Sequence, residues 1–208
     1  MIVLTSDGLS TKSLRDSIKR QIPRKGKAAI ITTASAEYKE KDKHIPSHIL
    51  ALCELGYSIS CMDVEHEDPK RLKDFDLILI NGGNPYYLLH HLRKSGADKV
   101  LKEMSEAGRT LIGVSAGSVV LQERFDLMDC YTAEMNAGVH VDSKIGVGLT
   151  NSIVMPHYDR CQQLYPAFES KLYDFEQKNQ VKVTRLKDGE AVIINDDGSI
   201  DRIFGRDV

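Results

Sequence analysis

The segment that decides the fold runs from Arg109 to Leu121 and reads Arg-Thr-Leu-Ile-Gly-Val-Ser-Ala-Gly-Ser-Val-Val-Leu. The apolar pair Leu111-Ile112 predicts a buried strand, and the apolar run after Gly117 predicts a helix, so the chain turns sharply between them. Ser115 lies at that corner in a Gly-x-Ser-x-Gly pattern, the nucleophile elbow that lifts a serine hydroxyl clear of a sheet. Small residues also form ordinary turns, so the motif alone makes Ser115 a candidate nucleophile and no more.

Upstream of the elbow, short apolar runs alternate with amphipathic segments. Repeated strand-helix-strand units of this length predict an α/β fold with a mostly parallel sheet, right-handed crossovers and helices on both faces. We expect one domain over residues 1–208. The predicted strands cover residues 2–5, 28–32, 57–62 and 77–80, and the predicted helices cover residues 11–21, 45–55 and two segments after Asn84 that are separated at Gly96.

A second glycine turn, Asn81-Gly82-Gly83-Asn84-Pro85, follows the continuous apolar run at 77–80. Such runs are typical of strands covered on both faces. In parallel α/β sheets, ligands bind at the carboxyl ends of the strands. The Gly82-Gly83 turn and the Ser115 turn should therefore open on the same edge of the sheet.

Downstream of the elbow the pattern changes. Residues 122–148 are polar and weakly periodic, which predicts a loop-rich excursion near the site. A short strand is expected at 152–155, and further strands at 181–185, 191–194 and 200–204. One helix is expected from about 160 to 178, with an apolar stripe for the core formed by Leu164, Phe168, Leu172 and Phe175.

Composition excludes several classes of protein. The 28 Lys and Arg nearly balance the 30 Asp and Glu, giving a net charge of -2 without a basic block, so no nucleic-acid partner is expected. No apolar run approaches the roughly 20 residues of a membrane span, and the first residues lack signal-peptide character, which favours a cytoplasmic protein. The four cysteines show no Cys-x-x-Cys spacing, so reduced, mostly packing cysteines are expected.

A serine nucleophile needs a base, and histidine is the usual one because its pKa lies near neutral pH. His157 is the best candidate because it follows a predicted strand end, where a parallel layout would place it beside Ser115. A metal site of His157, Asp159 and Cys161 lacks a second convincing histidine, so no metal is expected. We expect the other histidines to be surface or loop residues, namely His44, His48, His66, His90, His91 and His140.

Three motifs together, Gly82-Gly83-Asn84, Gly113-Val-Ser-Ala-Gly-Ser118 and Pro156-His157-Tyr158, resemble the dipeptidase E (aspartyl dipeptidase) and cyanophycinase family of serine peptidases. The resemblance implies a three-layer α/β/α sandwich similar to class I glutamine amidotransferases, with serine in place of their cysteine. It also implies a serine peptidase whose oxyanion hole uses the backbone N–H groups of Gly83 and Ala116. No cofactor is implied.

The resemblance is incomplete where the substrate would bind. The segment from Tyr158 to Lys171 is shorter than in dipeptidase E and lacks the arginine motif that receives an N-terminal aspartate, although Arg160 lies nearby. The expectation is therefore a hydrolase of short peptides without an assigned preference. Homodimer formation stays open.

The third member of the triad has more than one candidate. Asp188 resembles the family's acid before a small turn residue, where the family usually has glutamate, and the shorter side chain requires its loop to come closer to His157. Asp129, in the excursion, is the alternative, and Glu190 is an outside candidate. Asp-Gly is also a common turn pair without any catalytic role. Asp188 is favoured because a turn between late strands can present a carboxylate at the sheet edge.

Two other function classes share some of these features. An esterase of the α/β-hydrolase type carries the same elbow, but its triad order is Ser, acid, His, whereas here the best histidine precedes the best acid. A catalytically silent binding module on the same fold would lack one triad member, whereas this chain has candidates for all three.

Overall fold

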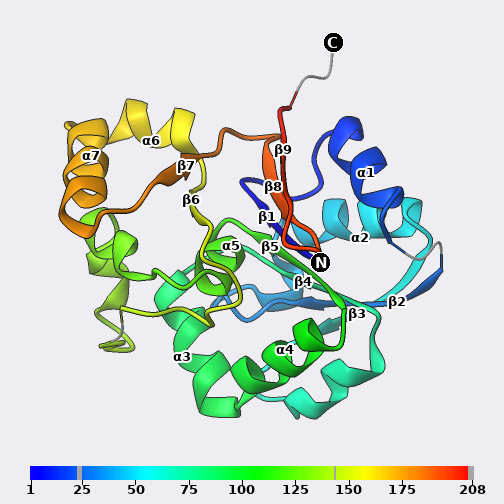
Figure 1. Cartoon of the computed structure of the whole chain (residues 1–208). Coiled ribbons are helices and arrows are strands. Elements are labelled where there is room, and N and C mark those ends of the chain that lie inside the picture. Colours follow the sequence, from blue (N-terminus) through cyan, green and yellow to red (C-terminus); the bar gives the residue numbers. More distant parts are fainter. Residues whose placement is uncertain (23–24, 143, 206–208) are drawn as a thin grey trace.

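The computed structural model describes residues 1–22, 25–142 and 144–205, which form a mostly parallel central sheet flanked by helices (Figure 1). The sheet has seven strands in the order β3-β2-β4-β5-β1-β8-β9. The first five are parallel, while β8 and β9 form an antiparallel hairpin against β1. The strands are β1 (Ile2–Thr5), β2 (Gly26–Ile31), β3 (Tyr57–Met62), β4 (Leu77–Ile80), β5 (Thr110–Val114), β8 (Ala191–Ile194) and β9 (Ile200–Ile203).

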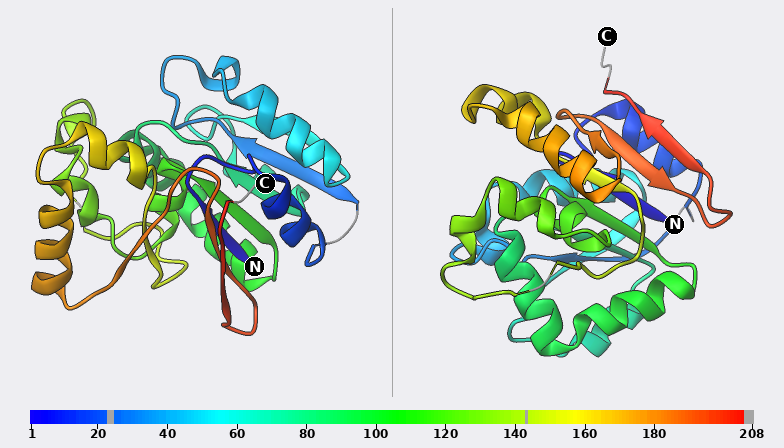
Figure 2. Two further views of the ribbon diagram at one scale, coloured as in Figure 1. Left: turned by 90° about the horizontal axis from the view of Figure 1, so that it is seen from above. Right: turned by 60° about the vertical axis from the view of Figure 1, so that its left-hand side comes forward.

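Two hydrophobic cores lie on the two faces of this sheet. Because side chains alternate along a strand, Ile78 and Ile80 face one core while Leu77 and Leu79 face the other. The predicted α/β sandwich is confirmed, with helices on both faces (Figures 1 and 2). One face carries α1 (Lys12–Lys19) and α2 (Ile45–Glu54), and the other carries α3 (Pro85–Ser95), α4 (Ala97–Glu106) and α5 (Ala116–Leu121).

The chain between α5 and β8 lies at one side of the central sheet, and its buried apolar residues join one of the two cores (Figure 2). Here β6 (Ile153–Met155) pairs in parallel with β7 (Val183–Arg185), so neither strand joins the central sheet. The excursion contains the 3₁₀ helices η3 (Asp126–Cys130) and η4 (Ala133–Asn136). Two shorter connections elsewhere contain η1 (Lys39–Lys41) and η2 (Pro69–Asp74).

The single long helix expected over 160–178 is wrong. Two helices, α6 (Tyr158–Leu164) and α7 (Phe168–Asn179), replace it. The break lies at Pro166, because proline lacks the N–H of the helical ladder and its ring forces the preceding residue away from helical geometry. Leu164 is consequently 70% exposed rather than part of the core stripe, whereas Phe168 is buried.

No helix within the described ranges is both long enough and apolar enough to cross a bilayer. The four cysteines are free thiols, one of them exposed and three partly buried.

Candidate active site

Ser115 lies between β5 and α5 in a backbone conformation that few residues adopt. Its φ of 50° and ψ of -110° are outside the regions favoured by L-residues, at a cost on the order of 1–3 kcal/mol. The Ser115 N–H donates to Thr5 O at 3.1 Å, and the Ser115 carbonyl accepts from Val119 N–H at 3.1 Å, so strand and helix hold the corner from both sides. At Gly117 an added Cβ would lie 2.1 Å from Ile80 O, which explains why α5 needs glycine to approach β4.

The Gly82-Gly83 turn lies beside this corner, as expected from the parallel strands β4 and β5. A Cβ on Gly82 would lie 3.2 Å from Ser115 Cβ. Gly83 has a φ of 140°, and a Cβ there would lie 2.2 Å from Ala34 O, so only glycine fits this close approach. Within the described residues, the N–H groups of Gly83 and Ala116 donate to no protein acceptor.

His157 reaches Ser115 from the end of β6. Its Nε2 lies 3.0 Å from Ser115 Oγ, and its Nδ1 lies 2.7 Å from Asp188 Oδ1. A carboxylate only accepts hydrogen bonds, so Nδ1 carries the proton and Nε2 of the neutral ring is free to accept from the serine hydroxyl. His157 has φ 53° and ψ 33°, a left-handed conformation that costs a non-glycine residue roughly 1–2 kcal/mol.

Asp188 is surrounded by donors. Its Oδ1 accepts from Ser6 Oγ at 2.8 Å as well as from His157, and its Oδ2 is ion-paired with Arg160. Burial alone would raise the pKa of Asp188, but the hydrogen bonds from Ser6 and His157 and the charge of Arg160 outweigh burial. The pKa of Asp188 is therefore held below its ordinary value, and the carboxylate stays ionised at neutral pH.

The approach of the Asp188 loop follows from the pairing of β6 with β7. This ladder continues past its last pair, because Leu186 N–H donates to Met155 O at 3.0 Å and Tyr158 N–H donates to Leu186 O at 2.9 Å. On the far side of Asp188, Gly189 N–H donates to Asp7 Oδ1 at 2.7 Å. The short aspartate side chain reaches His157 because its loop is held on both sides.

The other two acids lie elsewhere. Asp129 is exposed in η3 and accepts a hydrogen bond from Tyr86 Oη at 2.8 Å. Glu190 accepts from the backbone N–H of Lys187 at 3.1 Å. Among the described contacts, neither carboxylate bonds to His157.

A pocket of about 260 Å³ opens beside Ser115. Charged and titratable side chains dominate its rim, and the Gly82-Gly83 turn forms part of its wall. Its lining consists of Ser6, Asp7, Asp42, Lys43, His44, His48, Asn81, Gly82, Gly83, Val114, Ser115, His157 and Arg160.

Two histidines interpreted as surface residues are in fact buried, His48 at 4% exposure and His91 at 6%. Burial lowers the pKa of His48, and its Nε2 lies 3.2 Å from Asn81 Oδ1, directly before the Gly82-Gly83 turn. The apolar pattern does not indicate that His48 is buried, because its neighbour is a glycine distant in the sequence. An added Cβ on Gly8 would lie 2.6 Å from the imidazole ring. His48 therefore forms part of the pocket wall.

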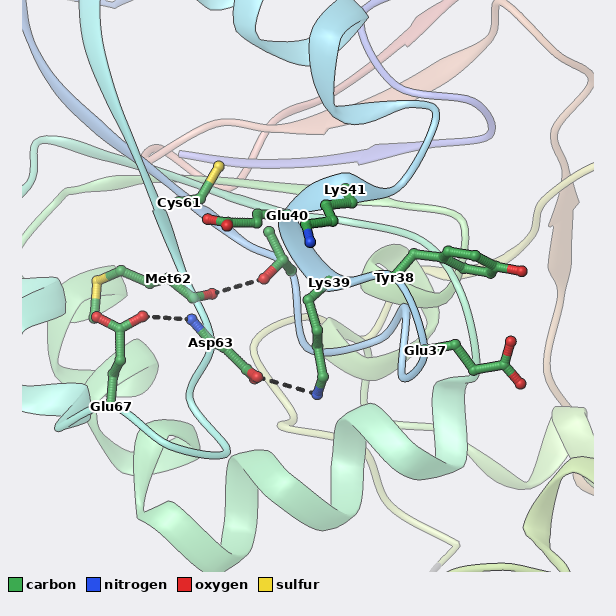
Figure 3. A pocket seen from close by; sticks show the side chains of 10 residues that line it. Glu37, Tyr38, Lys39, Glu40, Lys41, Cys61, Met62, Asp63 and Glu67 are labelled. Carbon is green, nitrogen blue, oxygen red and sulfur yellow. Dashed lines mark hydrogen bonds and ion pairs between the residues drawn. The ribbon is translucent and has the colours of Figure 1, made fainter.

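A second pocket, of about 300 Å³, lies beside the ends of β2 and β3 (Figure 3). Figure 3 shows Lys39 pointing to Asp63, and the two side chains form an ion pair at 3.1 Å. Asp63, Glu65 and His66 lie close enough to hold a metal ion, but the Lys39 ammonium already contacts both carboxylates. This pocket lacks a serine-histidine pair, so the site beside Ser115 is the better candidate.

Ser6, like His48, belongs to the site and is not among the residues that the sequence pattern indicated. It follows β1, whose carboxyl end lies beside that of β5 because Thr5 pairs with Val114. The signal was the polar run Thr5-Ser6-Asp7 at the carboxyl end of a predicted strand.

Known proteins are similar to this chain in sequence or in fold. An uncharacterized peptidase of Listeria innocua is 24% identical over 182 residues, which cover 86% of this chain and 85% of the relative. Peptidase E of Shewanella oneidensis is 42% identical over 80 residues, which cover 38% of this chain and 34% of that protein. The crystal structure of a candidate peptidase E from Listeria monocytogenes has the same fold, with a TM-score of 0.76 and 24% identity over 97% of this chain and 96% of its own.

The model of peptidase family S51 matches residues 2–201. Since this match extends from the first strand of the central sheet to the last, the chain belongs to peptidase family S51 and is a peptidase.

Proposed function

We propose that the protein is a serine peptidase that hydrolyses short peptides through Ser115, His157 and Asp188. One observation carries the proposal, namely the continuous hydrogen-bonded chain from Asp188 through His157 to Ser115, with distances of 2.7 Å and 3.0 Å. This arrangement of nucleophile, base and orienting acid defines a catalytic triad independently of the order of its residues in the chain.

The geometry supports an acyl-enzyme mechanism. Ser115 Oγ attacks the peptide carbonyl while His157 Nε2 takes the hydroxyl proton, and the Asp188 carboxylate stabilises the imidazolium that forms. His157 then gives this proton to the departing amine. In the second half, the same ring takes a proton from a water molecule that attacks the acyl carbon and returns it to Ser115 Oγ as the acyl–oxygen bond breaks, which releases the acid.

The oxyanion of the tetrahedral intermediate needs donors, and we assign these to the N–H groups of Gly83 and Ala116. Both groups lack a protein acceptor within the described residues, and Ala116 begins helix α5, whose N-terminus favours negative charge. A structure with a bound phosphonate tests the assignment. Both N–H groups should lie about 2.7–3.1 Å from the phosphonyl oxygen, and two groups directed away from it would exclude them as donors.

The size of the site supports short substrates. Pockets for drug-sized ligands span about 300–1,000 Å³, and the pocket beside Ser115 is slightly smaller at about 260 Å³. Arg160, the cation nearest in sequence to His157, is paired with Asp188, so we assign no preference for an N-terminal aspartate. Dipeptides and tripeptides with systematically varied first residues would measure the preference directly.

Replacement of the nucleophile tests the proposed function. Ser115→Ala should lower turnover of a cleaved peptide by roughly four to six orders of magnitude, as removal of triad members does elsewhere. A fluorophosphonate should label the wild-type protein and leave a folded Ser115→Ala variant unlabelled. Near-normal peptide hydrolysis by that variant would exclude the serine mechanism.

A further inference from the structure

The hydroxyl of Ser6 links His157 and Asp188, the two members of the proposed triad that follow β6 and β7 of the two-stranded sheet. Ser6 Oγ accepts a hydrogen bond from the backbone N–H of His157 at 2.8 Å and donates to Asp188 Oδ1 at 2.8 Å. A hydroxyl has one proton, and a carboxylate can only accept, so this proton is directed to Asp188. Ser6 itself is fully buried at the wall of the pocket, while both of its bonds are partly buried.

The position of Ser6 is itself fixed by the central sheet. Ser6 directly follows β1, and its own N–H donates to Glu190 O at 3.2 Å. The preceding residue, Thr5, accepts the N–H of Ser115. The Ser6 hydroxyl is therefore held in register with the nucleophile, because it directly follows strand β1, which contacts the elbow, and its own backbone contacts the segment that carries Asp188.

Each bond of Ser6 constrains a different degree of freedom. The bond to the His157 N–H holds the left-handed backbone that directs the imidazole towards Ser115. The bond to Asp188 Oδ1 fixes the rotation of a carboxylate whose other oxygen is paired with Arg160, a side chain that is 61% exposed. Solvent competes with the arginine, so Ser6 is the buried partner that sets the carboxylate plane.

We propose that Ser6 is a positioning residue of this peptidase, a fourth member of the hydrogen-bonded chain that orients His157 and Asp188 for the attack by Ser115. The proposal rests on the serine-peptidase function proposed above. It extends that function, because the position of the base then depends on a residue that directly follows the first strand.

Ser118 provides a matched control. Like Ser6 it is fully buried, and its hydroxyl also makes one bond of each kind to β1, donating to Thr5 O at 2.8 Å and accepting from Thr5 N–H at 2.9 Å. It contacts neither His157 nor Asp188 in the described structure. Alanine at either position removes one bond that the hydroxyl donates and one that it accepts, and the bond of Ser6 to a carboxylate makes Ser6→Ala the more destabilising of the two.

The experiment measures the rate constant for inactivation by a fluorophosphonate, which reports activation of Ser115 without a known substrate. In Ser6→Ala this rate constant should fall about 10- to 100-fold, as expected for a misplaced base, while in Ser118→Ala it should stay within about threefold of wild type. With a cleaved peptide, Ser6→Ala should lower kcat by a similar factor and change KM less than about twofold.

A spectroscopic signature separates positioning from stability. The proton on His157 Nδ1 should give a low-field proton NMR signal in the wild-type protein and in Ser118→Ala, and the signal should be lost or shifted in Ser6→Ala. If Ser6→Ala does not fold, Ser6→Cys, which keeps the shape but donates weakly, is judged by the same measurements.

An inactivation rate constant within threefold of wild type in the folded Ser6 variant, or an equal loss in Ser118→Ala, would overturn the proposal for Ser6. Failure of the wild-type protein to react at Ser115 would instead reject the proposed function and the role of Ser6 with it.

Discussion

Asp188 and Asp129 each accept a hydrogen bond from an aromatic side chain, His157 and Tyr86 respectively, but only Asp188 belongs to the candidate active site. Asp188, in the turn between β7 and β8, accepts a hydrogen bond from His157 at 2.7 Å, and Asp129, in η3, accepts one from Tyr86 at 2.8 Å. Asp188 has two further partners, Ser6 and Arg160, and its side chain is only 21% exposed, whereas Asp129 is exposed. One hydrogen bond to a ring therefore does not distinguish a candidate catalytic acid. The environment on the other side of the carboxylate does.

The largest expected difference between Asp188 and Asp129 is in turnover. Asp188→Asn should lower kcat by about 10³–10⁴-fold, because an amide in place of the carboxylate no longer enforces the proton on His157 Nδ1. Asp129→Asn should leave kcat within about threefold of wild type. Steady-state kinetics on one peptide checks both variants, and circular dichroism confirms that each is folded. The reverse ranking would assign the role of the acid to Asp129.

A second, smaller effect concerns stability against pH. The pKa of Asp188 is lowered in the folded protein, so its ionised form stabilises the fold above the ordinary pKa of an aspartate, about 3.9. This stabilisation should be lost as the pH falls below about 4 and through the lower folded value. Urea unfolding from pH 3 to 7 should show a constant difference between wild type and Asp188→Asn above about pH 5 that shrinks in acid. A difference that grows in acid would contradict the direction of the pKa shift.

The smallest expected effect is on stability and tests whether the hydrogen bond between Tyr86 and Asp129 is purely structural. Tyr86 is buried, and burial together with the hydrogen bond to Asp129 raises its pKa. Tyr86→Phe should reduce the free energy of unfolding by about 1.5–3 kcal/mol, the net value of one hydrogen bond to a charged group, with turnover nearly unchanged. Thermal unfolding and peptide kinetics on the same preparation measure both. A tenfold loss of turnover without further loss of stability would show that this turn also acts on the active site.

Local sequence patterns predicted most of the central sheet. The strands expected at 2–5, 57–62, 77–80 and 191–194 have the same bounds in the structure, because continuous apolar runs between turn residues leave little choice of boundary. The confirmed α/β class follows from the alternation of these runs with amphipathic helices. The placement of both glycine turns on one edge follows from the parallel order of β4 and β5.

Contacts between segments far apart in the chain could not be predicted from the sequence. Nothing in residues 153–155 indicates that this strand leaves the central sheet to pair with Val183–Arg185, yet that pairing brings the Asp188 loop to His157. The sequence could therefore name Asp188 and Asp129 but not measure their distances to the ring. Ser6 was missed for the same reason, since its partners lie 151 and 182 residues away along the chain.

The small sheet of β6 and β7 positions two members of the proposed triad, His157 and Asp188, while Ser115 follows strand β5 of the central sheet. The small sheet has three residue pairs, and a two-stranded sheet of that size is marginal by itself, so its opening should need less free energy than unfolding of the seven-stranded sheet. His157 and Asp188 would leave together in such an opening, while Ser115 stays with β5. Amide protons of β6 and β7 should then exchange with solvent before those of β4 and β5, and in rising denaturant the peptidase should lose activity while its central sheet is still folded.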